Sequence, residues 1–105
     1  MSKFHSKPTT LDGYRFDSMA EARRYGELKL LERAGEITSL ELQPKFEIVV
    51  EDAHICYYFA DFIYWDNATD KWVVEDVKGV RTAVYKLKKK LVEAIYGITI
   101  TEVEA

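Results

Sequence analysis

Several residue types that support common functions are scarce in this sequence. Cys56 is the single cysteine among 105 residues, so no internal disulfide can form. The only histidines, His5 and His54, are far apart in the chain, and with one cysteine they cannot build a Cys/His zinc site. The five glycines are isolated from one another, which excludes a glycine-rich phosphate loop, and no Gly-x-Ser-x-Gly hydrolase elbow is present.

Long apolar runs are missing as well. No uncharged apolar stretch approaches the ~18 residues that a membrane-spanning helix needs. Lys3 and Lys7 are not followed by the apolar core of a secretion signal. We therefore expect a cytoplasmic protein of a reducing compartment, with no membrane association.

The overall composition is that of a folded protein. Apolar residues make up 48%, aromatic residues 13% and charged residues 31%, which favours one globular domain over residues 1–105. Residues 36–76 carry ten acidic and two basic side chains, whereas all six cations of residues 77–105 lie between Lys78 and Lys90. Such a chain is either an acidic protein with one solvated basic helix, or a nuclease whose carboxylates hold metal ions and whose lysines hold phosphates.

Capping residues predict two helices. Ser18 and Glu21 form a capping box for a helix that runs to about Ala34. Thr82 caps a second helix that runs to about Tyr96. Apolar residues recur at helical spacing in the second helix, and we expect them to form its core stripe: Val84, Leu87, Leu91 and Ile95.

The remaining segments have the pattern of β-strands. Asp12-Gly13 favours a short N-terminal hairpin, and Gln43-Pro44 interrupts an extended stretch. Residues 55–65 are apolar on both faces, which predicts a central strand buried on two sides, followed by a turn at 66–70. The other strands are Ile37–Leu42, Phe46–Val50, Trp72–Lys78 and Ile98–Val103. After the hairpin the order is α-β-β-β-α-β, an α/β fold with a mixed central sheet flanked by two helices.

Asp61 is out of place in this pattern, because it lies in the middle of the apolar run 55–65. A buried, ionised carboxylate costs several kcal/mol unless it is paired or coordinates a metal ion. Asp61 is therefore either one half of a salt bridge with a nearby lysine or arginine, or a metal ligand.

The next strand carries a second acid and a lysine. Side chains alternate along a strand, so Asp76 and Lys78 share one face and Glu75 points to the other. A hairpin centred near residues 68–69 sets Asp61 opposite Asp76, whereas a slip of one residue would set it opposite Glu75. Two facing carboxylates repel each other unless a divalent cation lies between them. The simpler alternative is that Asp76 and Lys78 form a solvated sheet edge.

Two further polar residues are candidates for the same site. Glu21 shares a helical stripe with Tyr25 and Leu28 that faces the core, so its carboxylate can point inward. Glu21 can instead serve only as the acid of its capping box. Gln43 is a weaker candidate, because its amide could orient a water molecule or could bond to nearby backbone.

The arrangement of Asp61 followed by Asp76-Val-Lys78 resembles the PD-(D/E)xK nuclease superfamily, with Ala60 where that family often has proline. A wider pattern, which covers nearly the whole chain, resembles a family of small phage and prophage proteins of uncharacterised function, placed among these nucleases near the Holliday-junction-resolvase-like branch. The motifs that carry this resemblance are Phe16-Asp-Ser-x-x-Glu21-Ala-x-x-Tyr25, Leu40-x-x-Gln43-Pro44-x-Phe46, Tyr58-x-Ala-Asp61-Phe62 and Val74-Glu-Asp76-Val-Lys78-Gly79.

The resemblance implies a restriction-endonuclease-like core that hydrolyses DNA phosphodiester bonds. It implies that Asp61, Asp76 and the Val77 backbone carbonyl hold Mg²⁺ or Mn²⁺, with Glu21 contributing directly or through water. Lys78 would neutralise the phosphate or activate the attacking water. Flanking phosphates would be held by Arg81 and by three lysines that share one side of the second helix, Lys86, Lys89 and Lys90.

The DNA substrate and the function both leave alternatives. Junctions, flaps, nicked duplexes and linear duplexes are all candidate substrates, and symmetric cleavage of branched DNA favours a homodimer. The alternative to a nuclease is a non-catalytic DNA-binding or interaction protein on the same fold. A third reading is a structural phage accessory protein whose acids form salt bridges.

Overall fold

A computed structural model describes residues 8–105, so the expectations attached to Lys3, His5 and Lys7 lie outside the described residues. The described chain begins with the predicted hairpin, formed by β1 (Thr9–Leu11) and β2 (Tyr14–Phe16). Its turn, Asp12-Gly13, has positive φ angles of 54° and 81°, as the tight hairpin turn requires. The Tyr25 hydroxyl donates to the Asp12 carboxylate at 3.0 Å, which anchors the hairpin on the helix that follows.

Both helices begin at the predicted caps. In α1 (Met19–Arg33) the Ser18 hydroxyl oxygen accepts the Glu21 N–H at 3.1 Å, and Tyr25 and Leu28 face inward with 3% and 0% exposure. In α2 (Ala83–Tyr96) the Thr82 hydroxyl oxygen caps the first turn. Within residues 8–105 no helix is long and apolar enough to cross a membrane.

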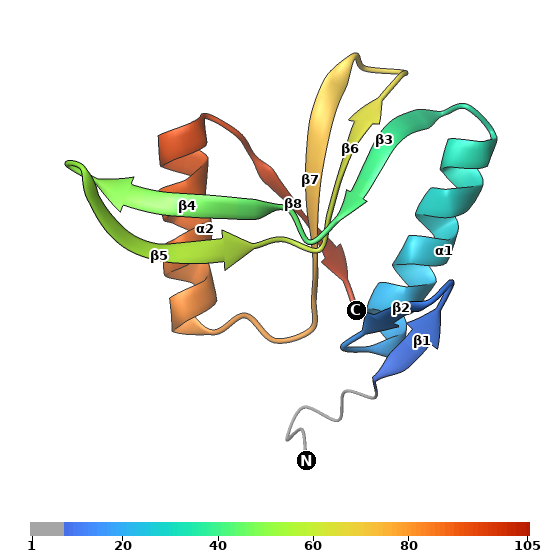
Figure 1. Ribbon diagram of the computed structural model, residues 1–105, viewed down its shortest axis with the longest axis horizontal. Helices are drawn as coiled ribbons and strands as arrows, with labels where there is room; N and C mark the ends of the chain where they lie inside the picture. Colours follow the sequence, from blue (N-terminus) through green and yellow to red (C-terminus); the bar gives the residue numbers. More distant parts are fainter. Residues whose placement is uncertain (1–7) are drawn as a thin grey trace.

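A mixed four-stranded sheet separates the two helices (Figure 1). Its order is β3 (Ile37–Leu42), β6 (Phe62–Asp66), β7 (Lys71–Lys78) and β8 (Ile100–Glu104), with only the β7–β8 pair parallel. Phe62, Tyr64 and Val77 pack with α1 on one face, whereas Ile63, Val74 and Ile100 pack with α2 on the other. The α/β fold with a mixed sheet flanked by two helices is therefore confirmed, and β7 is buried on both sides.

The prediction of one central strand over residues 55–65 is wrong. The chain forms β5 (Ala53–Phe59), breaks at Ala60–Asp61, and continues as β6 in a different sheet. β5 pairs instead with β4 (Lys45–Val50), and this hairpin extends across α2 to one side of the molecule (Figure 1). The run is apolar on both faces although only one face of β5 packs on α2, and Phe59 remains 55% exposed.

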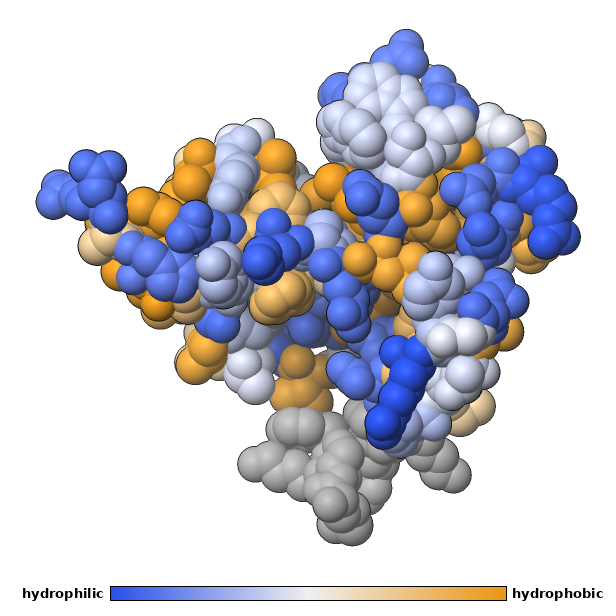
Figure 2. Space-filling model, in the orientation of Figure 1, coloured by the Kyte–Doolittle hydropathy of each residue, from blue (hydrophilic) through white to orange (hydrophobic). Residues whose placement is uncertain are grey.

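The predicted core stripe of α2 is correct only at Leu91, which is half-buried and packs against the core. Val84, Leu87 and Ile95 are exposed, whereas Tyr85 and Val92 are the buried residues of this helix. The helix turns this side inward because the Tyr85 hydroxyl bonds to Glu102 of β8 at 2.8 Å while the ring packs beside Tyr58. Apolar surface therefore gathers over α2 and the β4–β5 hairpin, at the left of Figure 2.

Candidate functional site

The break in the chain at Ala60–Asp61 positions the first acid. Backbone hydrogen bonds continue through the break, because the Ala60 N–H donates to Pro44 and the Gln43 N–H donates to Asp61, at 3.2 and 2.9 Å. On the other side the Asp61 N–H donates to the Glu75 carbonyl at 3.0 Å. Asp61 is thus held between β3 and β7, at the point where two sheets meet.

The register of β6 and β7 brings Asp61 to Asp76, as the turn at 66–70 predicted. Phe62 pairs with Glu75, so the preceding residue, Asp61, lies across from Asp76. The two carboxyl groups are within hydrogen-bonding reach of each other. Asp61 Oδ2 accepts the Val77 N–H at 2.6 Å, which fixes the orientation of the carboxylate. The Val77 carbonyl, predicted as a metal ligand, belongs to the same residue whose N–H holds Asp61.

Asp76 is 1% exposed, so the alternative of a solvated sheet edge is wrong. Its carboxylate accepts a hydrogen bond from the Tyr58 hydroxyl of β5 and pairs with Lys78 Nζ at 3.0 Å. The same ammonium group lies 4.4 Å from the centre of the Tyr85 ring. Lys78 and Asp76 therefore share a face, as predicted, and Lys78 compensates the charge of Asp76.

Negative charge at Asp61 lacks such compensation. No ion pair involves Asp61 in the described part of the chain, so the salt-bridge reading finds no partner for it. Burial, together with contact with the Glu21 carboxyl, raises the pKa of Asp61 to about 7. Burial also raises the pKa of Asp76 to about 6, against the lowering effect of the Tyr58 hydrogen bond and of Lys78. The pair therefore holds a proton under conditions in which ordinary aspartates are fully ionised.

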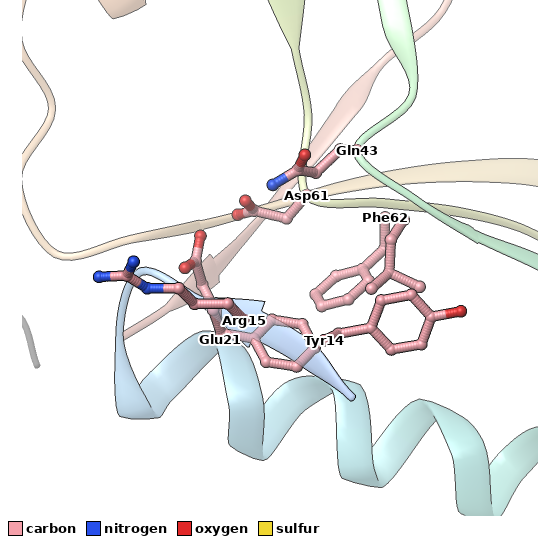
Figure 3. A pocket seen from close by; sticks show the side chains of 8 residues that line it. Tyr14, Arg15, Glu21, Gln43, Asp61 and Phe62 are labelled. Carbon is pink, nitrogen blue, oxygen red and sulfur yellow. The ribbon is translucent and has the colours of Figure 1, made fainter. Parts of the chain in front are cut away.

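Glu21 both bonds to the start of α1 and points inward, the two orientations that the sequence left open. One of its oxygens accepts the Asp17 N–H at 2.9 Å, so the side chain does turn back on the start of α1. Its carboxyl group also contacts Asp61, toward which it points in Figure 3. The capping bond and the inward orientation coexist because the cap uses a single carboxylate oxygen.

A pocket of about 250 Å³ opens beside Glu21 and Asp61 (Figure 3). Its apolar lining comes from Tyr14, Phe16, Leu42 and Phe62, and its polar lining from Glu21, Asp61, Gln43 and Arg15. In Figure 3 the Gln43 amide lies next to Asp61. Asp76 does not line the pocket, so of the three acids only Glu21 and Asp61 face it.

The opposite face of β7 carries a different acid arrangement, which the sequence did not predict. Glu75 is 1% exposed and receives two hydrogen bonds from Arg24 of α1, at 2.8 and 2.7 Å. The Tyr64 hydroxyl donates a third. The guanidinium fork matches the carboxylate, so this acid is fully paired.

The predicted phosphate-binding cations are divided among different contacts. Arg81 donates to Glu102 at 3.0 Å and to Glu104 at 2.5 Å, so its charge ties the segment between β7 and α2 to β8. Lys89 pairs with Glu93 at 3.3 Å. Lys86 and Lys90 are exposed and form no ion pair with residues 8–105, which leaves them as the cations of α2 most available to a polyanion.

The donor set suits a hard divalent cation only in part. Asp61 contacts Glu21 on one side and Asp76 on the other, and these carboxylates offer the oxygen ligands that Mg²⁺ prefers. Yet no group of three or more His, Cys, Asp or Glu side chains in residues 8–105 converges on a common point for a metal ion. A cation would therefore be held by the Asp61–Asp76 pair, with water completing its shell.

Sequence reasoning missed three contributors to this site: Tyr14, Arg15 and Tyr58. Tyr58 lies within one of the motifs quoted above, but nothing in its spacing shows that its hydroxyl reaches Asp76 on another strand. Tyr14 and Arg15 belong to the hairpin directly before the helix of Glu21, and this proximity in sequence was the available signal.

Comparisons with known proteins give one match. The model of a family described as "Protein of unknown function (DUF1064)" matches residues 1–102. No curated protein and no solved structure matches the chain.

Proposed function

The chain belongs to the DUF1064 family, and we propose that it is a Mg²⁺-dependent endonuclease that hydrolyses DNA phosphodiester bonds. As the motifs imply, we also propose that the chain is a member of the PD-(D/E)xK nuclease superfamily and that it acts in phage DNA processing. In this proposal Mn²⁺ can replace Mg²⁺, and DNA is the partner.

The contact between Asp61 and Asp76 carries this proposal. Two acids that share a buried position raise each other's free energy, and folding tolerates them at a cost that a structural role does not explain. A divalent cation removes this cost by replacing the shared proton, so metal binding should release protons. Mg²⁺ bound there supplies Lewis-acid activation of the phosphate and of a water nucleophile.

The surrounding residues have distinct tasks in this scheme. The Val77 N–H and the Tyr58 hydroxyl hold Asp61 and Asp76 in fixed orientations, which lowers the reorganisation needed when a substrate binds. Lys78 is placed to neutralise charge that develops on the phosphate oxygens. Glu21, at the pocket wall, can accept a proton from water.

A cleavage assay tests the proposal. Branched, flapped, nicked and linear DNAs are incubated with the protein in Mg²⁺, in Mn²⁺ and in EDTA, with Asp61→Asn as the site variant. Asp52→Asn is the matched control, because Asp52 is exposed on the β4–β5 turn. We expect metal-dependent cleavage by the wild type and the control, and none by Asp61→Asn.

Calorimetric titration with Mg²⁺ and Mn²⁺ gives a readout that does not depend on cleavage. Proton release on binding by the wild type, absent in Asp61→Asn, supports the metal site. DNA binding without cleavage of any substrate would contradict the proposal and favour the non-catalytic DNA-binding alternative. The ion pair between Lys78 and Asp76 is the observation that favours this alternative, since it neutralises one acid without a metal.

A further inference from the structure

The pocket beside Asp61 contains more than hydrolysis of a phosphodiester requires. Acids and a cation suffice for the reaction, yet half of the pocket lining is apolar or aromatic: Tyr14, Phe16, Leu42 and Phe62. Tyr14 is 50% exposed at its rim, 5.8 Å between ring centres from Tyr25, which supports it from below. A large aromatic side chain left open to solvent beside reactive groups needs an explanation in terms of the substrate.

Flat aromatic walls and a few convergent polar groups are the features by which proteins hold an unstacked nucleobase. The Gln43 amide both donates and accepts hydrogen bonds, so it can pair with the edge of a base. Its backbone is held at a φ of 51°, an uncommon conformation for glutamine, by the bond from its N–H to Asp61. The side-chain amide of Gln43 therefore stays next to Asp61, the acid that would act on the neighbouring phosphate.

Arg15 completes this arrangement. It is the single cationic side chain among the described residues that line the pocket, and no ion pair with Glu21 or Asp61 occupies it. A guanidinium that stays unpaired next to two carboxylates is free to bind the phosphate of the nucleotide whose base enters the pocket.

The size of the pocket determines which DNA can use it. A volume of about 250 Å³, bounded by β2, the start of α1, the end of β3 and the start of β6, suits one base better than a base pair. We propose that this pocket binds a single unpaired nucleobase next to the scissile phosphate, so that the substrate is DNA with an unstacked nucleotide at a branch, bulge or end. This inference rests on the proposed nuclease function and names its substrate class. Fully paired DNA would have to extrude a base first, which opposes its binding.

Fluorescence of 2-aminopurine tests this binding mode. The probe base is placed either in a one-nucleotide bulge or in the matching paired duplex, and the full chain is added in EDTA so that no cleavage occurs. We expect at least tenfold tighter binding of the bulged DNA, with quenching of the probe as it stacks on Tyr14. Tyr14→Ala should lose the quenching and bring the affinity ratio close to one, and Tyr14→Phe should keep both.

The control is Tyr57→Ala, which removes a similarly exposed tyrosine from β5, outside the pocket. It should leave the preference for bulged DNA unchanged. Equal affinity of the wild type for bulged and paired DNA, or a preference that Tyr14→Ala retains, overturns the inference.

Failure of this inference can be told apart from failure of the nuclease proposal. Metal-dependent cleavage without preference for an unpaired base leaves a nuclease whose pocket has another role, and overturns the inference alone. Quenching and preference without cleavage of any DNA support the base pocket and contradict the nuclease.

Discussion

Glu75 and Asp76 are neighbours on β7, each 1% exposed, yet they are built into the protein in opposite ways. Glu75 faces α1, where Arg24 and Tyr64 satisfy its carboxylate with three hydrogen bonds. Asp76 faces α2 and the Asp61 carboxyl, with one tyrosine and one lysine to offset two negative charges. Burial alone therefore does not distinguish the two acids. The distinguishing feature is a second acid within reach, next to an open pocket.

The largest effect should come from the acids on the Asp76 side. Asp61→Asn and Asp76→Asn should each lower Mg²⁺-dependent cleavage by more than about a hundredfold, because each removes charge that holds the cation. Without metal the melting temperature should hold or rise slightly, since repulsion between the acids is relieved. Asparagine can still accept the hydrogen bonds from Val77 or Tyr58. A marked loss of melting temperature in either variant would make these acids structural.

The converse is expected on the Glu75 side. Arg24→Met leaves the Glu75 carboxylate buried without its cation and should lower the free energy of unfolding by about 3 kcal/mol. Its neighbour Arg23 is exposed on the same helix, so Arg23→Met is the matched control and should be nearly neutral. Urea unfolding of both variants measures the difference. Equal stability of the two would mean that the Arg24–Glu75 pair contributes nothing beyond a surface ion pair.

Lysines on the two sides of Gly79 should separate rate from affinity. Lys78→Ala should lower turnover by about a hundredfold with little change in DNA affinity, because in the proposed mechanism its charge acts on the transition state. Replacing Lys86, Lys89 and Lys90 together by alanine should weaken DNA binding and flatten its salt dependence, with little effect on turnover at saturation. The structure adds that Lys89 should contribute least of the three, since Glu93 already pairs with it. Similar effects of both changes on rate and affinity would end this distinction.

Glu21 should give a smaller effect on the rate. Glu21→Gln keeps an oxygen that can accept the Asp17 N–H, so stability should change by less than ~1 kcal/mol. Cleavage should fall by more than tenfold, and the Mg²⁺ concentration at half-activity should rise, because one negative charge next to Asp61 is lost. Wild-type kinetics in this variant would return Glu21 to a capping role only.

The smallest effect is a pH dependence of stability in the absence of metal. The folded protein binds protons at Asp61 and Asp76 more tightly than the unfolded chain, whose aspartates titrate near 3.8. This contribution to stability is complete below about pH 4 and is lost as the pH rises through 6 and 7. Relative to Asp61→Asn, the wild type should lose a few degrees of melting temperature between pH 5 and pH 8. The control Asp52→Asn should follow the wild type.

Local signals predicted much of the frame. The caps at Ser18 and Thr82 act within a few residues, so they can be recognised in the sequence. The turn at 66–70 fixes the register of β6 and β7, and side chains alternate along each strand, so the Asp61–Asp76 pair could be predicted. Elements whose position depends on distant packing were not predictable. Which side of α2 turns inward depends on the hydroxyl contact of Tyr85 with β8, and the partner of Glu75 lies 51 residues away in sequence.

The candidate site shows the same limit. Asp61 reaches Asp76, and Lys78 pairs with Asp76, as the sequence predicted, because paired strands carry all three. Glu21 contacts Asp61 from the helix stripe that the sequence offered as one of two alternatives. Arg81 was predicted to bind phosphate, but acids of β8 bind its guanidinium instead. These acids lie near Arg81 only because β8 pairs in parallel with β7, which the local sequence does not reveal. The pocket is formed where the N-terminal hairpin packs beside β3 and β6. The periodicity of the sequence does not predict contacts between such distant segments, so the pocket could not be predicted.

The break at Ala60–Asp61 also determines where residues can be inserted without moving Asp61. Residues added in facing pairs at the Glu51–Asp52 turn lengthen the β4–β5 hairpin and leave Asp61 in place. A single residue inserted between Asp61 and Phe62 shifts Asp61 relative to the β6–β7 register, in which Phe62 faces Glu75, and turns the carboxylate away from Asp76. Relatives with longer or shorter hairpins can therefore keep the same pair of acids, provided that the short segment joining β5 to β6 retains its length.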